Sequence, residues 1–189
     1  MELTFAILLG ALFGFALNRA GATNPQNIIN MLRLSDTSLM KAILFAIGLS
    51  SLVLFGGLAL GIIDPAHVSI KTAYIGVFVG GILLGIGFAI AGYCPGTGLA
   101  AAATGRKDAL IFALGGLAGA FAFTLSYGWL ADNTFLFDKI AGGNVGLAVT
   151  GNDKYDALIP FSGTAIGIVQ GIAFIAIAYL IPTHILNKK

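Results

Sequence analysis

Charged side chains are scarce in this sequence of 189 residues. Lysine, arginine, aspartate and glutamate make up 10% of it, whereas a soluble domain carries about 25%. The formal net charge of +2 is too small for the basic surface that a nucleic-acid-binding protein needs. The apolar fraction is 58% and the mean hydropathy is +0.96, so a soluble enzyme would lack polar surface. These values indicate a polytopic membrane protein.

Cysteine occurs once, at Cys94, which excludes an intramolecular disulfide and any CxxC metal site. The two histidines, His67 and His184, are isolated from each other, and the sequence contains no nucleotide-binding motif. We therefore expect no metal, no cofactor and no enzymatic activity. Glycine, in contrast, is abundant at 27 residues, and its spacing at residues 76/80, 81/85, 115/119 and 163/167/171 is typical of helices that pack closely in lipid.

Five uncharged stretches are long enough, or nearly so, to cross a bilayer as helices, which requires roughly 20 residues. They cover residues 3–18, 42–63, 72–105, 109–131 and 157–183. With the N-terminus outside, seven of the ten lysines and arginines lie inside, as the positive-inside rule requires. We expect an all-α polytopic protein of the inner membrane with about five transmembrane helices and its C-terminus in the cytoplasm.

The chain is expected to form a single transmembrane domain, residues 1–189, that contains two repeats. Three glycines recur after 71 residues, and a proline follows each set. The matched glycines are Gly10 with Gly81, Gly14 with Gly85 and Gly21 with Gly92. Repeat 1 covers residues 3–63 and repeat 2 covers 72–131, followed by an external loop or short hairpin over 132–156 and a final helix over 157–183. Paired interruptions in two halves are typical of transporter binding sites.

The stretch 72–105 is too long for one helix across a ~30 Å hydrocarbon core, and it contains a break from Gly92 to Gly98. Pro95 suits the first position of a new helix, which puts Cys94 at its N-cap. Irregular backbone at membrane depth persists only inside protein or along a cavity. We therefore expect broken or re-entrant half-helices and an internal anion site at the helix start.

Three positions carry the candidate site. Cys94 is either a functional thiol at the break or a small buried hydrophobic residue. Asn24 precedes a half-helix over 26–34 at the equivalent position, where it is an N-cap and a candidate lining residue of the same cavity. Gln170 lies in mid-span and is expected to face the interior, as a substrate contact or an interhelical hydrogen bond. The candidate substrate-binding residues are Cys94, Tyr93, Pro95, Gly96, Thr97, Asn24 and Gln170.

Two segments carry a family resemblance. The segment GFAIAGYCPGTGLAAAATGRKDAL resembles the YeeE/YedE family of sulfur-compound transporters, and GFALNRAGATNPQNIINMLRL resembles the matching segment of its half-length members. The resemblance covers residues 10–129. Larger members import thiosulfate along central cysteines by hydrogen bonds between thiol and substrate sulfur. The resemblance implies that Cys94 is such a cysteine and that Tyr93, Pro95 and Gly96 shape its loop.

The resemblance also implies partners, because this chain is half as long as the larger members and has one cysteine where they have several. A complete pathway would need a homodimer or a second half-length subunit, and a small soluble sulfur-carrier protein often accompanies the family. The expected ligand is a sulfur-containing anion, in a lipid membrane and without nucleic acid. The leading hypothesis is a permease or permease subunit for thiosulfate or a related compound. The alternatives are a membrane sulfurtransferase or redox-sensing component that moves no substrate, and a structural subunit of another channel.

Overall fold

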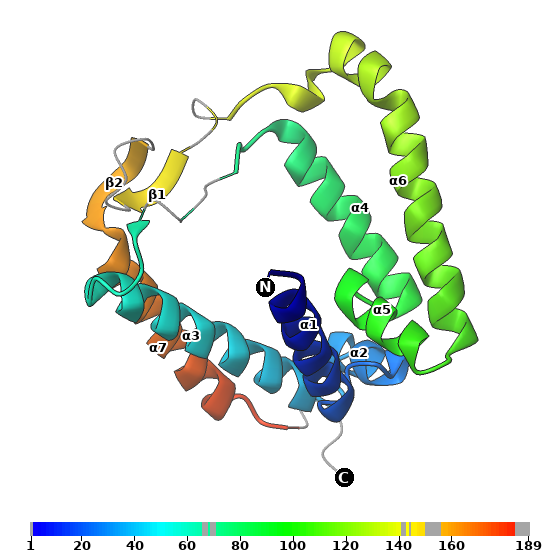
Figure 1. Ribbon diagram of the computed structural model, residues 1–189, viewed down its shortest axis with the longest axis horizontal. Coiled ribbons are helices and arrows are strands. Elements are labelled where there is room, and N and C mark those ends of the chain that lie inside the picture. Colours follow the sequence, from blue (N-terminus) through cyan, green and yellow to red (C-terminus); the bar gives the residue numbers. More distant parts are fainter. Residues whose placement is uncertain are drawn as a thin grey trace. The chain divides into compact units, whose positions relative to one another are not determined.

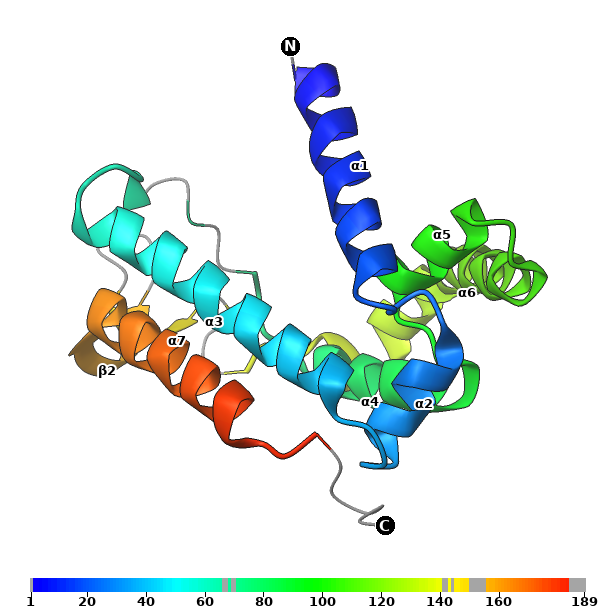
Figure 2. The ribbon, with the colours of Figure 1, turned by 90° about the horizontal axis from the view of Figure 1, so that it is seen from below.

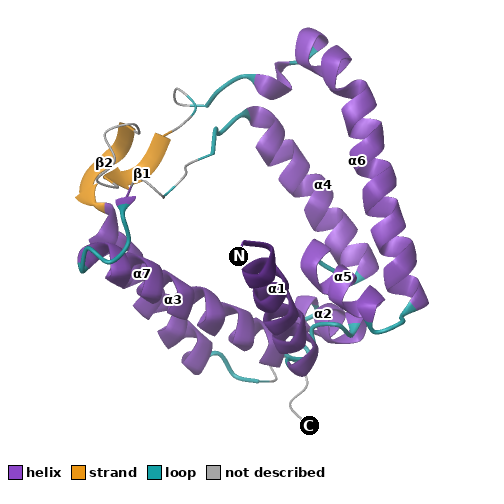
Figure 3. Cartoon of the chain, in the orientation of Figure 1, coloured by secondary structure: helices purple, strands orange, loops and turns teal. Residues whose placement is uncertain are grey.

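The computed structural model of the protein describes residues 2–65, 68, 71–140, 143, 145–149 and 156–183. Within these residues, five helical segments are long and apolar enough to cross a membrane, which confirms the expected polytopic helical fold (Figures 1 and 3). The helices are α1 (Glu2–Arg19), α2 (Pro25–Leu32), α3 (Ser38–Ala59), α4 (Ile75–Ala91), α5 (Pro95–Ala103), α6 (Lys107–Asn133) and α7 (Gly163–Leu180).

The chain divides into two compact units. The first unit holds α1, α2, α5, α6 and the part of α4 that begins at Gly81. The second unit holds α3 from Met40, the beginning of α4, a short 3-10 helix η2 (Phe135–Phe137), two strands and α7. Each of the two expected half-helices, α2 and α5, therefore belongs to the first unit.

The segment between α6 and α7 differs from the expected loop or hairpin. It contains β1 (Val145–Val149) and β2 (Asp156–Ser162), which pair in parallel, with Gly146 opposite Ala157 and Ala148 opposite Ile159. The last helix begins at Gly163 and not at residue 157, because Pro160 disfavours a helical conformation at the residue before it and lacks a backbone N–H. Residues 141–142, 144 and 150–155 of this segment lie outside the described residues.

Glycines allow α3 and α7 to pack closely in the second unit (Figure 2). A Cβ atom on Gly48 would lie 2.7 Å from the carbonyl oxygen of Gly171, and one on Gly171 would lie 2.9 Å from the carbonyl oxygen of Gly48. A Cβ atom on Gly167 would meet the ring of Phe55, and the Ser51 hydroxyl donates a hydrogen bond to the Gly167 carbonyl at 2.9 Å. The packing face expected at 163/167/171 is therefore observed.

The other expected glycine faces are open within this chain. A Cβ atom at Gly80, Gly81, Gly85, Gly115 or Gly119 would have no atom within 4 Å, and the same is true of Gly10 and Gly14 on α1. Gly76 differs, because a Cβ atom there would lie 2.9 Å from the Leu136 carbonyl oxygen.

Two alanine substitutions on α3 test the packing of α3 on α7. Glycine in a helix interior costs about 1 kcal/mol relative to alanine, so Gly56→Ala, in open space, is expected to raise the melting temperature of the purified protein or leave it unchanged. Gly48→Ala forces the backbones of α3 and α7 apart. It is expected to lower the melting temperature, although the gain in helix propensity is the same. The measurement is thermal unfolding in detergent, and equal shifts for both variants would contradict the packing.

Candidate functional site

The break between α4 and α5 forms as the sequence predicts. Gly92 ends α4 with φ at +68°, a left-handed conformation that favours glycine. Cys94 has extended backbone dihedrals at the N-cap of α5, and Pro95 occupies the first turn. The chain therefore leaves one helix and starts the next within three residues, and the thiol lies at the new helix start.

Cys94 and Thr97 form a reciprocal cap at the start of α5. The backbone N–H of Thr97 donates to the Cys94 sulfur at 3.3 Å, and the backbone N–H of Cys94 donates to the Thr97 hydroxyl oxygen at 2.9 Å. The Thr97 hydroxyl lies 3.2 Å from both the Cys94 sulfur and the Cys94 carbonyl oxygen. Because the sulfur acts as an acceptor in this cap, its own S–H hydrogen is left for another acceptor.

Thr97 is buried, so the loss of its hydroxyl has a measurable effect. Thr97→Val keeps the shape but leaves the Cys94 N–H without its acceptor, and it is expected to lower the free energy of unfolding by about 1 kcal/mol and to change the rate of Cys94 alkylation. Thr97→Ser keeps the hydroxyl and is the control. The measurements are thermal unfolding and maleimide labelling of the purified protein, and identical behaviour of the two variants would contradict the cap.

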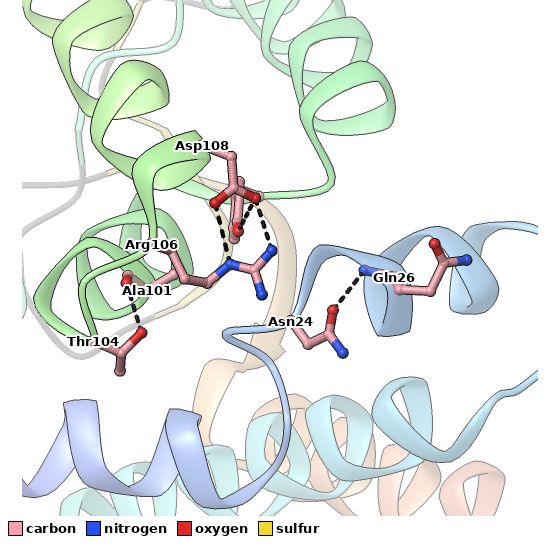
Figure 4. Close-up of polar contacts among 7 residues, drawn as sticks. Asn24, Gln26, Ala101, Thr104, Arg106 and Asp108 are labelled. Carbon is pink, nitrogen blue, oxygen red and sulfur yellow. Dashed lines mark hydrogen bonds and ion pairs between the residues drawn. The ribbon is translucent and has the colours of Figure 1, made fainter.

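The segment before α2 has the same local design. Gly21 has φ at +73°, Asn24 is the N-cap of α2, and Pro25 follows it. The side-chain oxygen of Asn24 accepts a hydrogen bond from the backbone N–H of Gln26 at 3.1 Å (Figure 4). The side-chain amide of Asn27 donates to the Gly21 carbonyl at 2.9 Å. Asn24 thus has the N-cap role that the sequence predicts, and its side chain is exposed.

The two half-helix starts lie against each other in the first unit. A Cβ atom on Gly92 would lie 2.9 Å from the Pro25 Cβ and 3.0 Å from the Pro25 carbonyl oxygen. Phe88, in the last turn of α4, packs against a buried cluster that includes Ile28 of α2. Gly92 lies two residues before the N-cap of α5, and Pro25 directly follows the N-cap of α2. The sequence related Asn24 to the same cavity but did not predict the contact between Gly92 and Pro25.

Tyr93 anchors the residue that precedes the thiol. Its side chain is 2% exposed and its ring centroid lies 5.7 Å from that of Phe112 on α6. Its hydroxyl donates to the Asp108 carboxylate at 2.9 Å. Arg106 contacts the same carboxylate at two points, from Nη2 at 2.8 Å and from Nε at 3.2 Å (Figure 4). The hydrogen bonds that Arg106 donates to the Asp108 carboxylate raise the pKa of the guanidinium.

Arg106 is one of the seven lysines and arginines that the positive-inside count places inside, and the sequence indicated no other role for it; Asp108 was not singled out. The available signal was the acid in the first turn of α6, two residues after an arginine. What sequence could not provide is the turn between α5 and α6 that brings this acid to the buried tyrosine.

Two clefts flank α5. One, of about 610 Å³, lies between α1 and α5, and the other, of about 550 Å³, lies between α4, α5 and α6. Gly96 lines the first, Tyr93 and Pro95 line the second, and Leu99 lines both. Cys94 is half-buried between these lining positions in the chain. The predicted residues from 93 to 97 therefore gather at one helix start with a cleft on each side of the helix.

Gln170 is placed elsewhere. It lies on α7 in the second unit, and its side chain is exposed. The buried face of α7 is formed by its small residues Gly163, Gly167, Gly171 and Ala178, so Gln170 lies off the face that packs on α3. The side chain is thus exposed within its own unit, and its expected orientation toward the interior of the protein stays a prediction.

No group of three or more potential metal ligands occurs among the described residues. His67 and His184 lie outside them. Cys94 has Thr97 as its observed side-chain partner, and a threonine hydroxyl beside one thiol is not a metal-binding set.

Comparison with known proteins identifies the family. A family model described as sulphur transport matches residues 19–186 of this chain, which include both half-helix starts. The chain belongs to the sulphur transport family. The family predicted from the Cys94 segment is therefore confirmed, and membership supports a transporter.

Two relatives that are similar in sequence to this sulphur transport protein come from one bacterial species. A probable transporter from Xylella fastidiosa (strain Temecula1 / ATCC 700964) is 29% identical over 127 residues, which cover 63% of this chain and 86% of the relative. A probable transporter from strain 9a5c is 29% identical over 127 residues, covering 63% of this chain and 87% of the relative. No solved structure matches the chain.

Proposed function

We propose that this sulphur transport protein is a membrane permease, or a permease subunit, for a reduced sulfur anion such as thiosulfate. The observation that carries the proposal is the Cys94 thiol at the N-cap of α5, two residues after Gly92, which contacts the first residue of α2. The family supports sulfur as the transported element. The geometry supplies a way to bind an anion that contains sulfur.

The anion's charge is stabilised by the helix starts. The N-terminus of each helix carries a partial positive charge, which favours an anion. Gly92, three residues before the first residue of α5, contacts Pro25 at the start of α2, and we infer that the partial charges of the two helix starts act on one region. Neither start needs a lysine or arginine side chain, which would bind an anion too tightly for passage.

The anion's sulfur is recognised by the thiol. The Cys94 sulfur accepts a hydrogen bond from the Thr97 N–H, which fixes its orientation at the helix start. The S–H hydrogen is then available to donate to the terminal sulfur of the substrate. This contact is a hydrogen bond and forms no covalent bond, so the substrate can leave again without a second reagent.

The apolar faces of the spans support a larger assembly. Gly81 and Gly85 on α4 and Gly115 and Gly119 on α6 have open space where a second helix could approach. A homodimer, or a pair with another half-length subunit, would cover these faces in the inner membrane. We place the N-terminus outside, because the lysines and arginines then lie mostly in the cytoplasm.

Transport and substrate protection test the proposal together. Purified protein is reconstituted into vesicles, alone or with a second half-length subunit, and uptake of radiolabelled thiosulfate is measured. Cys94 is then labelled with impermeant thiol reagents from each side, with and without thiosulfate. We expect uptake, labelling from both sides and slower labelling when thiosulfate is present.

Two outcomes would contradict the permease. Absence of uptake for every sulfur anion tested, with either composition, would exclude transport by this chain. Labelling of Cys94 from one side only, with sulfur exchange at the thiol, would favour a membrane sulfurtransferase instead.

A further inference from the structure

Three polar side chains form a chain of contacts that ends beside Cys94. The Tyr93 hydroxyl lies 2.9 Å from Oδ2 of Asp108, and the same oxygen accepts from Nη2 of Arg106 at 2.8 Å. Nε of Arg106 contacts the other carboxylate oxygen at 3.2 Å. The start of α6 is therefore linked to the residue that precedes the thiol.

The contact between Tyr93 and Asp108 matters more than the ion pair between Arg106 and Asp108. The side chains of that pair are 40% and 50% exposed, and exposed ion pairs contribute little. Tyr93 is 2% exposed and packs among Ala101, Ala109 and Phe112. Without Asp108, its hydroxyl would be left in these apolar surroundings without an acceptor, which is costly.

The backbone around Tyr93 transmits its position to the thiol. Gly92 before it is held in a left-handed conformation against Pro25, and Pro95 after the thiol has a fixed φ. The Cys94 backbone has therefore few ways to move independently of the tyrosine side chain. A change at the Tyr93 hydroxyl is expressed as a change in the orientation of Cys94.

We propose that Asp108 is a positioning residue that acts through Tyr93 to hold Cys94 in the orientation that meets the transported anion. Arg106 orients the Asp108 carboxylate by its two-point contact. The inference rests on the proposed permease function. It adds a side chain that lies outside the Cys94 loop and acts without touching the substrate.

The test compares Tyr93→Phe, Asp108→Asn, Asp108→Glu and the double variant Tyr93→Phe/Asp108→Asn in reconstituted vesicles. Two quantities are measured: the rate at which a maleimide alkylates Cys94, and KM with the maximal rate for thiosulfate uptake. Tyr93→Phe and Asp108→Asn are each expected to change the alkylation rate and to raise KM by about tenfold, the effect of weakening or losing one hydrogen bond to a charged group. The double variant is expected to add little to either single variant, because both act on one contact: Tyr93→Phe removes its donor and Asp108→Asn removes the charge of its acceptor.

Conservative and neighbouring variants exclude a general loss of structure. Asp108→Glu keeps a carboxylate and is expected to restore part of the alkylation rate and KM. Lys107→Gln alters a charge at the same helix start and is expected to behave as the wild type. All variants are checked for monodisperse elution, and if Asp108→Asn fails this check, Tyr93→Phe carries the test.

The outcomes separate this inference from the permease function. If Tyr93→Phe and Asp108→Asn leave both quantities unchanged, or if their effects add fully in the double variant, the positioning role is wrong, even where Cys94→Ala abolishes uptake. If Cys94→Ala leaves uptake intact, the permease mechanism fails, while the alkylation rates still decide whether Asp108 positions the thiol.

Discussion

Replacement of Cys94 by alanine is expected to reduce sulfur-anion uptake by about tenfold to a hundredfold, because a hydrogen bond to a charged group contributes about 1.5–3 kcal/mol. The variant removes the S–H donor from the helix start while leaving the starts of α5 and α2 in place. The expected loss lies in uptake, measured as initial rate in vesicles at equal protein content.

Alanine also removes the cap at Thr97, so a second variant is needed to separate capping from recognition. An alanine N-cap costs about 1 kcal/mol relative to a polar one, whereas serine is among the preferred N-cap residues. Cys94→Ser is therefore expected to fold at least as stably as the wild type and still to transport poorly, because its shorter hydroxyl cannot reach the position of the sulfur. Ser126→Ala on α6 is the unrelated control. Full uptake by both Cys94 variants would show that the thiol does not contribute to transport.

The second large effect is expected at Gly92, where alanine should abolish most uptake. The left-handed conformation at φ +68° disfavours any side chain, with a cost of roughly 1–2 kcal/mol. In addition, the new Cβ would lie 2.9 Å from a ring carbon of Pro25 and 3.0 Å from its carbonyl oxygen. Neither the proline ring nor the backbone can rotate away, so the starts of α2 and α5 must separate.

Gly105 offers a matched control for this substitution. It has φ at +85°, yet a Cβ atom there would have no atom within 4 Å. Gly105→Ala therefore carries the conformational cost without the contact with Pro25. We expect both alanine variants to lose some thermal stability, and only Gly92→Ala to lose uptake and change the alkylation rate of Cys94. Equal loss of uptake in both would show that the contact between the half-helix starts has no role in transport.

Local chemistry made the break and its cap predictable from sequence. Gly92, Cys94 and Pro95 determine each other's conformations within four positions, so the N-cap could be assigned without knowledge of the rest of the chain. The membrane-spanning helices were equally predictable, because hydropathy over about 20 residues depends only on composition. The segment before α7 was misassigned because its apolar residues resemble a span, although Pro160 marks it as extended.

Contacts between distant residues were not predictable in the same way. The approach of Gly92 to Pro25 joins two loops separated by three helices, and a glycine pattern shows that close approach is allowed but not by which partner. The hydrogen bond between Tyr93 and Asp108 depends on the turn that follows α5. The exposure of Gln170 depends on which side of α7 meets α3, and an almost uniformly apolar helix has no polar stripe from which to infer it.

The close approach of α3 and α7 at Gly48 and Gly171 has a consequence for how this helix pair can assemble in lipid. Burial of apolar surface gives no gain there, because lipid tails are as apolar as the helices. Association must come from dispersion between many closely spaced atoms, which is weak for each pair and large in sum. Glycine contributes contact area while losing no side-chain rotamer freedom. The pair therefore assembles with a small entropic penalty, at a backbone separation that a side chain on either glycine would prevent.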